Sequence, residues 1–480
     1  MANHAQQLAD FVHDTPFERL PAEVVDYTKL VILDSLICGI AAGPAERSRM
    51  MHAVVKQLGG PPEASVFGMP GRAPAVHAAM ANAEMMNLLD ADDTLFSSSH
   101  FAVFSVAAGL AEAQRLGRSG KDLIRSVALG FDVNTRLNLA TLLMDEVDGS
   151  FQWASLAGMG FAAFGTAASA AVLSRLNCEQ MRNLFGLVSW MAPTSVCMGV
   201  TARREFESMK YANYAGVAQA GMLATRLAEQ GYVGDQECLD REPGFMRAQG
   251  SLKTDFELLV AELGQKWWIL ETALKYYPSC RYTHGPIDML RKLMREQRLQ
   301  AADIERIEIH MNPMAYAHSL FRDPAKSIKS DHRAPLNGAF NIPYVMALAA
   351  LGRRPGPAWY AKENIEDPAV WTLASRIHTT VDEGAKDEVV RAFRETRIRR
   401  FRKTRGALTV WARGQRYHCT TEYCDGDPWT PETRPTWERV ASKFEDFCGD
   451  FLPPRTIKEI VDQVRHLETV ADVSTELTVI

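Results

Sequence analysis

The first 267 residues carry apolar side chains at the three- and four-residue spacing of amphipathic helices. This spacing is clear over residues 24–42, where Val24, Tyr27 and Val31 share one face and glycines close the pattern. The same spacing predicts further helices over residues 81–89, 101–115, 122–137, 152–173, 179–198 and 209–230. This part of the chain is therefore predicted to be almost entirely helical.

The pattern changes after Trp268. Strands are predicted over residues 304–311, 377–381, 407–412 and 416–422. Apolar residues mostly alternate in these segments, as they do in half-buried strands, and the last two segments are predicted to form a hairpin around Gly414. Helical spacing then returns over residues 437–447 and 457–467.

These patterns predict a mainly α fold with a smaller α+β unit inserted into the chain. Because helices return at the C-terminal end, we expect this end to pack back onto the first helical domain. The expected domains are residues 1–268, residues 269–425 and the returning helices of residues 426–480.

The densest polar stretch, residues 88–100, lies between two predicted apolar helices and contains three aspartates, four hydroxyl side chains and a histidine. Such a linker must satisfy its polar groups internally or use them on a ligand. A structural interpretation is that Asp92, Asp93 and Thr94 bond to backbone amides, while one of the serines at 97–99 caps the next helix. It explains His100 less well, because a histidine near a carboxylate can be tuned as an acid or base near neutral pH.

A second polar segment, residues 275–284, lies at the predicted junction of the two units and combines two cations, three phenols, a thiol and an imidazole. A cleft at such a junction is a favoured place for a small-ligand site. The alternative interpretation is a proline-containing turn that leads into a helix, with the aromatic residues in the core. Lys210 is a further candidate: at the start of an apolar helix it either extends to solvent or points at an anion.

Composition narrows the class of protein. Of the 480 residues, 47% are hydrophobic and 23% are charged, which is ordinary for a soluble globular protein. A net charge of −5 gives no reason to expect a nucleic-acid or anionic-membrane partner. The apolar stretch over residues 157–173 is rich in alanine and glycine, and we predict a buried helix there rather than a membrane span.

The eight cysteines include no Cys-x-x-Cys pair, which argues against a zinc ribbon or an iron–sulfur centre. Free thiols in a reducing cytosol are the simplest interpretation. Residues 1–10 lack the basic and apolar regions of a signal peptide, so we expect a cytoplasmic protein.

The chain resembles the MmgE/PrpD family, which includes 2-methylcitrate dehydratases, cis-aconitate decarboxylases and iminodisuccinate epimerases. The most specific matches are the acidic box of residues 90–94 with His100, and the Lys-x-Tyr-Pro-x-Cys-Arg-Tyr-Thr-His segment of residues 275–284. Weaker matches occur at residues 33–35, 119–123, 130–136, 209–210, 227–234 and 339–344.

The resemblance implies a helical domain formed by both chain ends, a smaller inserted α+β lid domain, and a site in the cleft between them. It further implies a homodimer, chemistry without a metal or an organic cofactor, and a small di- or tricarboxylate as substrate. By this resemblance the pocket is lined by Asp90, Thr94, His100, Lys210 and Lys275.

Two positions depart from the family pattern. Gln152 stands where family decarboxylases and many dehydratases are expected to carry a histidine, and a glutamine cannot act as an acid or base. Cys280 also stands where the decarboxylases are expected to carry a histidine. These departures argue against itaconate-forming decarboxylation and allow a substrate outside the well-known set.

The chemistry that the resemblance implies removes a proton from a carbon next to a carboxylate, and then expels hydroxide or returns the proton on the other face. Such a step needs a base, cations that hold the carboxylates, and an acid. We assign His100 as acid/base, with Asp90 orienting it or sharing the proton, whereas Asp92 and Asp93 hold the turn.

The remaining candidates are expected to bind substrate. Lys210, which we also count among the catalytic residues, is assigned with Lys275 and Arg281 to the substrate carboxylates, and Thr94 to a hydrogen bond. Tyr277, Cys280, His284 and Gln152 complete the expected lining. We place a 2-methylcitrate dehydratase-like hydro-lyase first, followed by an epimerase or racemase, a cis-aconitate-type decarboxylase and a non-catalytic binding protein.

Overall fold

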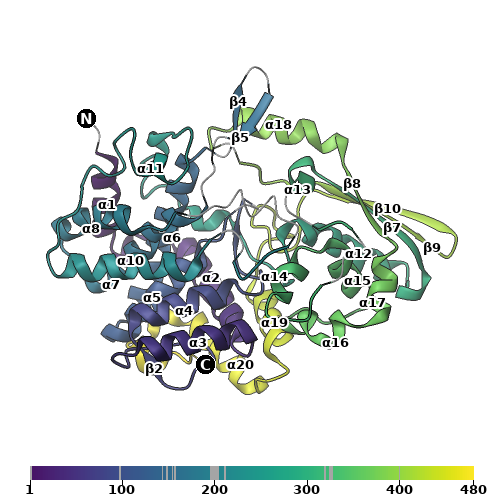
Figure 1. Ribbon diagram of the computed structural model, residues 1–480, viewed down its shortest axis with the longest axis horizontal. Coiled ribbons are helices and arrows are strands. Elements are labelled where there is room, and N and C mark those ends of the chain that lie inside the picture. The colour runs from purple at the N-terminus through teal and green to yellow at the C-terminus, as the bar shows by residue number, and fades with distance from the viewer. Residues whose placement is uncertain are drawn as a thin grey trace.

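The computed structural model describes residues 3–96, 99–142, 144–147, 150–153, 155, 158–194, 205–209, 212–317, 321–323, 328–398 and 400–479. A large helical body and a smaller unit built around a sheet lie side by side (Figure 1). The predicted mainly α fold with an inserted α+β unit is confirmed.

Within the described residues, the helical body begins with nine helices before residue 230. Their bounds are α1 His4–Asp14, α2 Ala22–Ala42, α3 Glu46–Leu58, α4 Ala75–Asn87, α5 Ala102–Leu116, α6 Gly120–Ala140, α7 Ala163–Ser174, α8 Cys178–Met191 and α10 Tyr214–Glu229. Helix α5 lies in the middle and packs against α4, α6 and α7, so every residue from 102 to 114 is buried. Gly109 permits this packing, because a Cβ there would lie 2.9 Å from the Ser126 hydroxyl of α6.

Short strands and one more short helix connect these elements. They are β1 Ala64–Ser65, β2 Arg72–Ala73, β3 Thr94–Leu95, β4 Met144–Val147, β5 Ser150–Trp153, β6 Thr272–Ala273 and the helix α11 Phe245–Ala248. The β4–β5 hairpin stands at the top of the view in Figure 1. The pairing of β3 with β6 joins residues that are far apart in the chain.

The smaller unit, which we call the lid, is built on the sheet β10-β9-β7-β8. Its strands are β7 Ile304–Met311, β8 Ile377–Val381, β9 Gly406–Ala412 and β10 Gln415–Thr421. Strand β8 runs parallel to β7, whereas β9 and β10 form the predicted hairpin. The turn residues Arg413 and Gly414 both have positive φ, 53° and 70°, which suits a two-residue hairpin turn.

Helices cover the sheet on the side where Ile307, Ile309 and Leu408 are buried. The lid helices are α12 His284–Glu296, α13 Pro313–Ala317, α14 Ala334–Ala339, α15 Ile342–Ala350, α16 Lys362–Ile365, α17 Pro368–Ala374 and α18 Lys386–Glu395. Of these, α12 packs on β9 and β10, and α15 packs on β8. The alternation seen in the sequence is therefore the alternation between the helix-covered face and the outer face of this sheet.

The C-terminal helices return to the helical body, as predicted. They are α19 Trp437–Cys448, α20 Pro454–Arg465 and α21 Val473–Glu476. In α20 the buried residues Ile457, Ile460, Val461 and Val464 form one face, and α19 and α20 both pack on α2. The helical body thus contains both ends of the chain.

Two predicted helices begin later than expected. The segment 152–173 starts as strand β5, and its helix begins only at Ala163, after a stretch that includes Gly158 and Gly160. The segment 209–230 becomes helical at Tyr214, because the Asn213 side chain accepts a hydrogen bond from Gly216 N at 2.9 Å and caps the helix there. None of the helices in the described ranges is long and apolar enough to cross a membrane.

Candidate active site

The acidic box begins with a residue whose backbone lies in the left-handed region, and the backbone of Phe96, two residues after the box, lies there too. Asp90 has φ 53° and Phe96 has φ 47°, which is unusual for a bulky side chain. Phe96 is buried, stacks on Trp429 at 6.3 Å and meets the edge of Trp268 at 6.2 Å between ring centroids. Such conformations persist only where the surroundings hold them, so the box is a firmly held loop.

A two-residue ladder joins the box to the second polar segment. Thr94 of β3 pairs with Ala273 of β6, and Leu95 pairs with Thr272. This antiparallel pairing places the residues just before Lys275 beside the box. The two polar stretches singled out in the sequence therefore meet at this point.

Lys275 contacts the box directly. Its Nζ donates to the backbone oxygen of Asp90 at 2.7 Å and lies 3.1 Å from Asp90 Oδ2, and both side chains are 1% exposed. An ammonium has three N–H bonds. No acceptor for the third lies among the residues that the structure describes.

The Nδ1 atom of His100 has two partners in the described part of the chain. Its Nδ1 lies 2.7 Å from the backbone oxygen of Asp93 and 3.1 Å from Asp92 Oδ2. Because neither a carbonyl nor an ionised carboxylate can donate, we infer that Nδ1 carries a proton. Asp92 is itself held by Asn87 Nδ2 at 2.9 and 3.0 Å.

The acids of the box thus have different partners. The sequence predicts that Asp90 orients His100 and that Asp92 holds the turn, whereas the structure places Asp92 at the imidazole and pairs Asp90 with Lys275. Spacing along the chain does not distinguish the two acids, since both are close to His100 in sequence.

Asp93 caps helix α5. Its carboxylate accepts from Ala102 N at 3.0 Å, from Phe101 N at 3.4 Å and from the Thr272 hydroxyl at 2.9 Å. The predicted serine cap is corrected for Ser99, because the N-cap residue is Phe101 and Asp93 supplies the side-chain bonds; residues 97 and 98 lie outside the described residues. Burial, and secondarily the Asp92 carboxylate, raise the pKa of Asp93 to about 8.

A buried ion pair that the sequence does not reveal lies behind the box. Lys443 Nζ of α19 donates to Asp34 Oδ1 of α2 at 2.6 Å and to the backbone oxygen of Ala91 at 2.7 Å. Burial raises the pKa of Asp34 to about 6, while Lys443 acts in the opposite direction. One signal was present in the sequence: Lys443 lies on the apolar face of its helix, among Val440, Phe444 and Phe447.

Most other candidates from residues 275–284 bond within or beside the lid. The Tyr277 hydroxyl donates to Asp288 Oδ1 at 2.7 Å, and Arg281 pairs with Asp427 at 2.5 Å. His284 Nε2 lies 3.2 Å from the backbone oxygen of Ser279, and Cys280 N donates to the backbone oxygen of Ala339 at 3.0 Å. Burial, and secondarily the Arg281 charge, lower the pKa of His284 well below its usual value.

These bonds belong to a turn that leads into α12. They match the alternative interpretation of this segment, a turn that leads into a helix. The roles of Tyr277, Cys280, Arg281 and His284 in substrate binding stay predictions. Thr94 differs from them, because it is 2% exposed and its hydroxyl has no hydrogen-bond partner in the described part of the chain. A buried hydroxyl without a partner is costly unless a ligand or water completes it.

Two further candidates are placed only in part. Gln152 lies in strand β5, opposite Asp145 of β4. Lys210 lies outside the described residues, so its role stays a prediction. Within the described ranges, no three His, Cys, Asp or Glu side chains come close enough to hold a metal ion.

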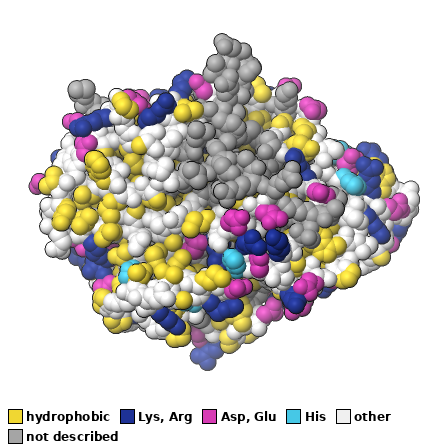
Figure 2. All heavy atoms as spheres, in the orientation of Figure 1, with side chains coloured by type: hydrophobic (Ala, Val, Ile, Leu, Met, Phe, Trp, Pro, Cys, Tyr) yellow, Lys and Arg dark blue, Asp and Glu magenta, His cyan; other side chains and the backbone are white. Residues whose placement is uncertain are grey.

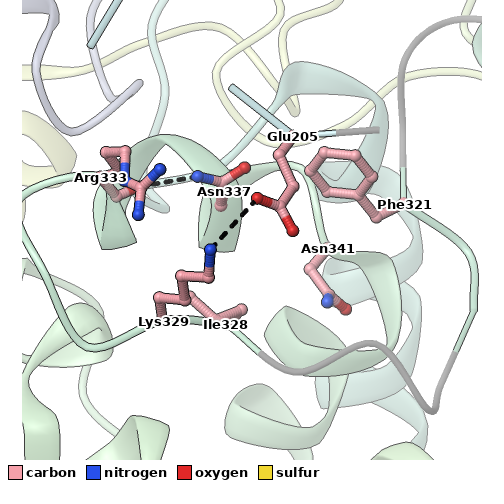
Figure 3. Close-up of a pocket in the computed structure, with 7 residues that line it drawn as sticks. All are labelled: Glu205, Phe321, Ile328, Lys329, Arg333, Asn337 and Asn341. Carbon is pink, nitrogen blue, oxygen red and sulfur yellow. Dashed lines mark hydrogen bonds and ion pairs between the residues drawn. The ribbon is translucent and has the colours of Figure 1, made fainter. Parts of the chain in front are cut away.

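The segment just before Lys210 is bound to the lid. Phe206 is buried against Phe321 and Phe340, and Asn337 bonds to both its backbone N and its backbone O, at 2.8 and 3.0 Å. Figure 3 shows the small pocket at this contact, in which the Glu205 carboxylate and the Lys329 ammonium face each other at 3.8 Å. Figure 2 shows charged and histidine side chains gathered where the two units meet on this face.

A larger cleft of about 480 Å³ separates the helical body from the lid on another side of residues 330–335. This volume is typical of small-ligand pockets. Leu88 and Leu89, which directly precede Asp90, line it from the body, and Tyr360 lines it from the lid. The Tyr360 hydroxyl donates to the backbone oxygen of Pro278. None of the described residues that line this cleft lies within residues 90–100 or 275–284.

Comparisons with known proteins match most of the chain. The family model described as the MmgE/PrpD N-terminal domain matches residues 6–257, and the model of the MmgE/PrpD C-terminal domain matches residues 277–468. A cis-aconitate decarboxylase of Aspergillus terreus is 24% identical over 475 residues, covering 95% of this chain and 91% of its own length.

Two other relatives carry similar names. A cis-aconitate decarboxylase-like protein of Aspergillus oryzae, oryM, is 24% identical over 500 residues, covering 100% of this chain and 97% of its own length. A cis-aconitate decarboxylase of Mus musculus is 26% identical over 387 residues, or 78% of this chain and 74% of its own length. The predicted lyase class is confirmed, and the chain belongs to the MmgE/PrpD family.

Proposed function

We propose that this enzyme is a hydro-lyase that needs no cofactor and dehydrates a small hydroxy di- or tricarboxylate resembling 2-methylcitrate. One observation carries the proposal: His100 is held through Nδ1 beside the Asp92 carboxylate. A carboxylate in this place stabilises the imidazolium that forms when Nε2 takes up a proton. Dehydration begins with such a proton abstraction, whereas decarboxylation begins with loss of carbon dioxide and then needs a proton donor.

In the proposed reaction, the bond between hydrogen and the carbon next to a carboxylate breaks first. The proton moves to His100 Nε2, and the electron pair spreads into the neighbouring carboxylate. The third N–H of Lys275 stabilises this charge, and the Thr94 hydroxyl donates a further hydrogen bond. The electron pair then returns to form the carbon–carbon double bond while the bond from the next carbon to its hydroxyl oxygen breaks. His100 gives its proton to that oxygen, so water leaves and an alkene remains.

A second candidate is decarboxylation of a cis-aconitate-like acid. The names of the relatives favour it, since they match this chain over most of its length. Gln152 and Cys280 argue against decarboxylation, because neither is the histidine expected in family decarboxylases. The homodimer and the cytoplasmic location stay predictions.

The test is incubation of the purified enzyme with 2-methylcitrate, citrate or cis-aconitate in deuterated water, followed by mass spectrometry and carbon dioxide detection. Formation of an alkene from a hydroxy acid supports the hydro-lyase. Carbon dioxide release from cis-aconitate without dehydration of any hydroxy acid overturns it in favour of the decarboxylase. Exchange with inversion and no alkene identifies an epimerase, and a raised melting temperature without turnover identifies a binding protein.

A further inference from the structure

Two buried lysines bond to consecutive carbonyl groups of the acidic box. Lys275 donates to the backbone oxygen of Asp90, and Lys443 donates to the backbone oxygen of Ala91, both at 2.7 Å. One lysine follows strand β6 and the other lies on α19, so the loop is held by parts of the chain that are distant in sequence.

The three N–H bonds of Lys443 are all engaged. Its Nζ reaches Asp34 Oδ1 at 2.6 Å, the backbone oxygen of Ala91 at 2.7 Å and Cys38 Sγ at 3.4 Å, and the side chain is fully buried. This ammonium has no donor left for a substrate. A buried ion pair is weak evidence for stability, because desolvation offsets most of its attraction. What the pair does supply is a fixed distance between α2, α19 and the box.

The carbonyl that Lys443 holds belongs to the residue between the two functional acids. Asp90 on one side pairs with Lys275, and Asp92 on the other contacts His100. Because the backbone at Asp90 is in the left-handed region, this stretch needs external contacts to stay as it is. A shift of Ala91 moves both acids at once.

We propose that Lys443, held by Asp34, is a positioning residue of the active site, whose bond to Ala91 sets the placement of Asp90 and Asp92. The inference rests on the proposed function. In this role Lys443 does not contact the substrate. It fixes the position of the groups that carry out the reaction.

The chain offers a matched control in Lys29. This lysine lies on α2, is 4% exposed, and, like the Asp34–Lys443 pair, joins α2 to the C-terminal part, through the Arg465 backbone oxygen and Glu468 at 3.0 Å. Its third partner is Asp26 of α2 at 3.1 Å, and none of the three lies in the box. Lys29→Met therefore removes a comparable buried cation without removing a contact to Ala91.

The test compares Lys443→Met, the double variant Asp34→Asn/Lys443→Met and Lys29→Met. The double variant avoids a buried charge without a partner, so it keeps the test valid if the single variant does not fold. We expect kcat to fall about 100-fold in both Lys443 variants, as a displacement of about 1 Å does, with KM within about threefold of wild type. Lys29→Met is expected to keep kcat within about threefold of wild type.

Hydrogen–deuterium exchange gives a readout that does not depend on the substrate. Peptides that cover residues 88–96 are expected to exchange faster in the Lys443 variants than in wild type. In Lys29→Met these peptides are expected to exchange at the wild-type rate. If the double variant folds and keeps wild-type kcat and exchange, the proposal is wrong. Equal kcat loss in Lys29→Met also overturns it, because the effect is then one of general stability. If wild type acts on no carboxylate, the proposed function fails, while the exchange data still decide the role of Lys443.

Discussion

Lys275 and Lys443 bond to neighbouring carbonyl groups of one loop, and each is paired with a buried aspartate, but their surroundings differ. Lys443 uses all three N–H bonds on Asp34, Ala91 and Cys38. Lys275 uses two, both on Asp90, and its third has no acceptor among the residues that the structure describes. The first lysine thus has all its N–H bonds engaged by the protein, whereas the described residues leave one N–H of the second for a ligand.

Under the proposed function, this difference separates a group that supports the site from one that is expected to contact the substrate. Both are buried and both are charged, so burial and charge alone do not distinguish them. The count of satisfied N–H bonds does, because a buried donor without an acceptor is costly until a ligand supplies one. Hydrogen-bond partners distinguish two threonines in the same way: the Thr94 hydroxyl lacks a partner in the described chain, whereas the Thr272 hydroxyl bonds to Asp93.

The largest effect is expected from Lys275. Lys275→Met removes the donor that stabilises the developing charge, so we expect kcat/KM to fall about 1000-fold, at the upper end for loss of one such donor. Asp90→Asn/Lys275→Met is the companion variant, since it leaves no buried carboxylate without its cation. Steady-state kinetics check this. A loss no larger than that of Asp34→Asn/Lys443→Met would contradict the distinction between the two lysines.

The next effect concerns the two acids. Asp92→Asn removes the charge beside His100 Nδ1, so we expect kcat to fall about 100-fold, within the range for general acid–base catalysis. Asp90→Asn keeps an acceptor for Lys275 and is expected to change KM more than kcat. The original sequence-based assignment regains support if Asp90→Asn has the larger effect on kcat.

A smaller effect is expected from replacing Thr94, which should lower activity but raise stability. Thr94→Val keeps the shape and removes a buried hydroxyl that lacks a partner, so we expect the free energy of unfolding to rise by about 1 kcal/mol. Catalysis is expected to fall about tenfold, because one hydrogen bond to substrate is worth about 1.4 kcal/mol or somewhat less. Denaturant unfolding and kinetics check the two signs. A loss of stability would mean that the hydroxyl has a partner in the folded protein.

The last effect concerns the pH dependence of stability and not catalysis. The pKa of Asp93 is raised from its ordinary value of 3.8 to about 8, so the folded chain holds this proton more tightly than the unfolded chain. The resulting stability is fully present below about pH 4 and is lost as the pH rises through 8. We expect the melting temperature of Asp93→Asn to decline less between pH 5 and pH 8 than that of wild type. Parallel curves would show that Asp93 is already ionised.

Local patterns predicted much of the fold. The strands over 304–311 and 377–381 have the predicted bounds, because alternation along a half-buried strand is visible within a few residues. The helix expected from residue 209 begins at Tyr214, because its start is set by the side-chain cap of Asn213 and not by the apolar pattern. Side-chain caps act over single residues and are easily missed.

The site was predicted less completely. The acidic box and Lys275 could be found because polar residues crowd together there in the sequence. Lys443 could not be connected with Asp34, because the two residues are 409 positions apart and only the fold brings them together. The cap of α5 was assigned to the nearby serines for a related reason: Asp93 reaches it across a turn of eight to nine residues.

The central claim is that His100 removes a proton from a carbon next to a carboxylate. Its most direct test is deuterium incorporation at that carbon during incubation of wild type and His100→Gln with a hydroxy di- or tricarboxylate in deuterated water. We expect incorporation by wild type, and a loss of at least about 100-fold in His100→Gln, while the substrate still raises the melting temperature. Undiminished incorporation by His100→Gln would contradict it.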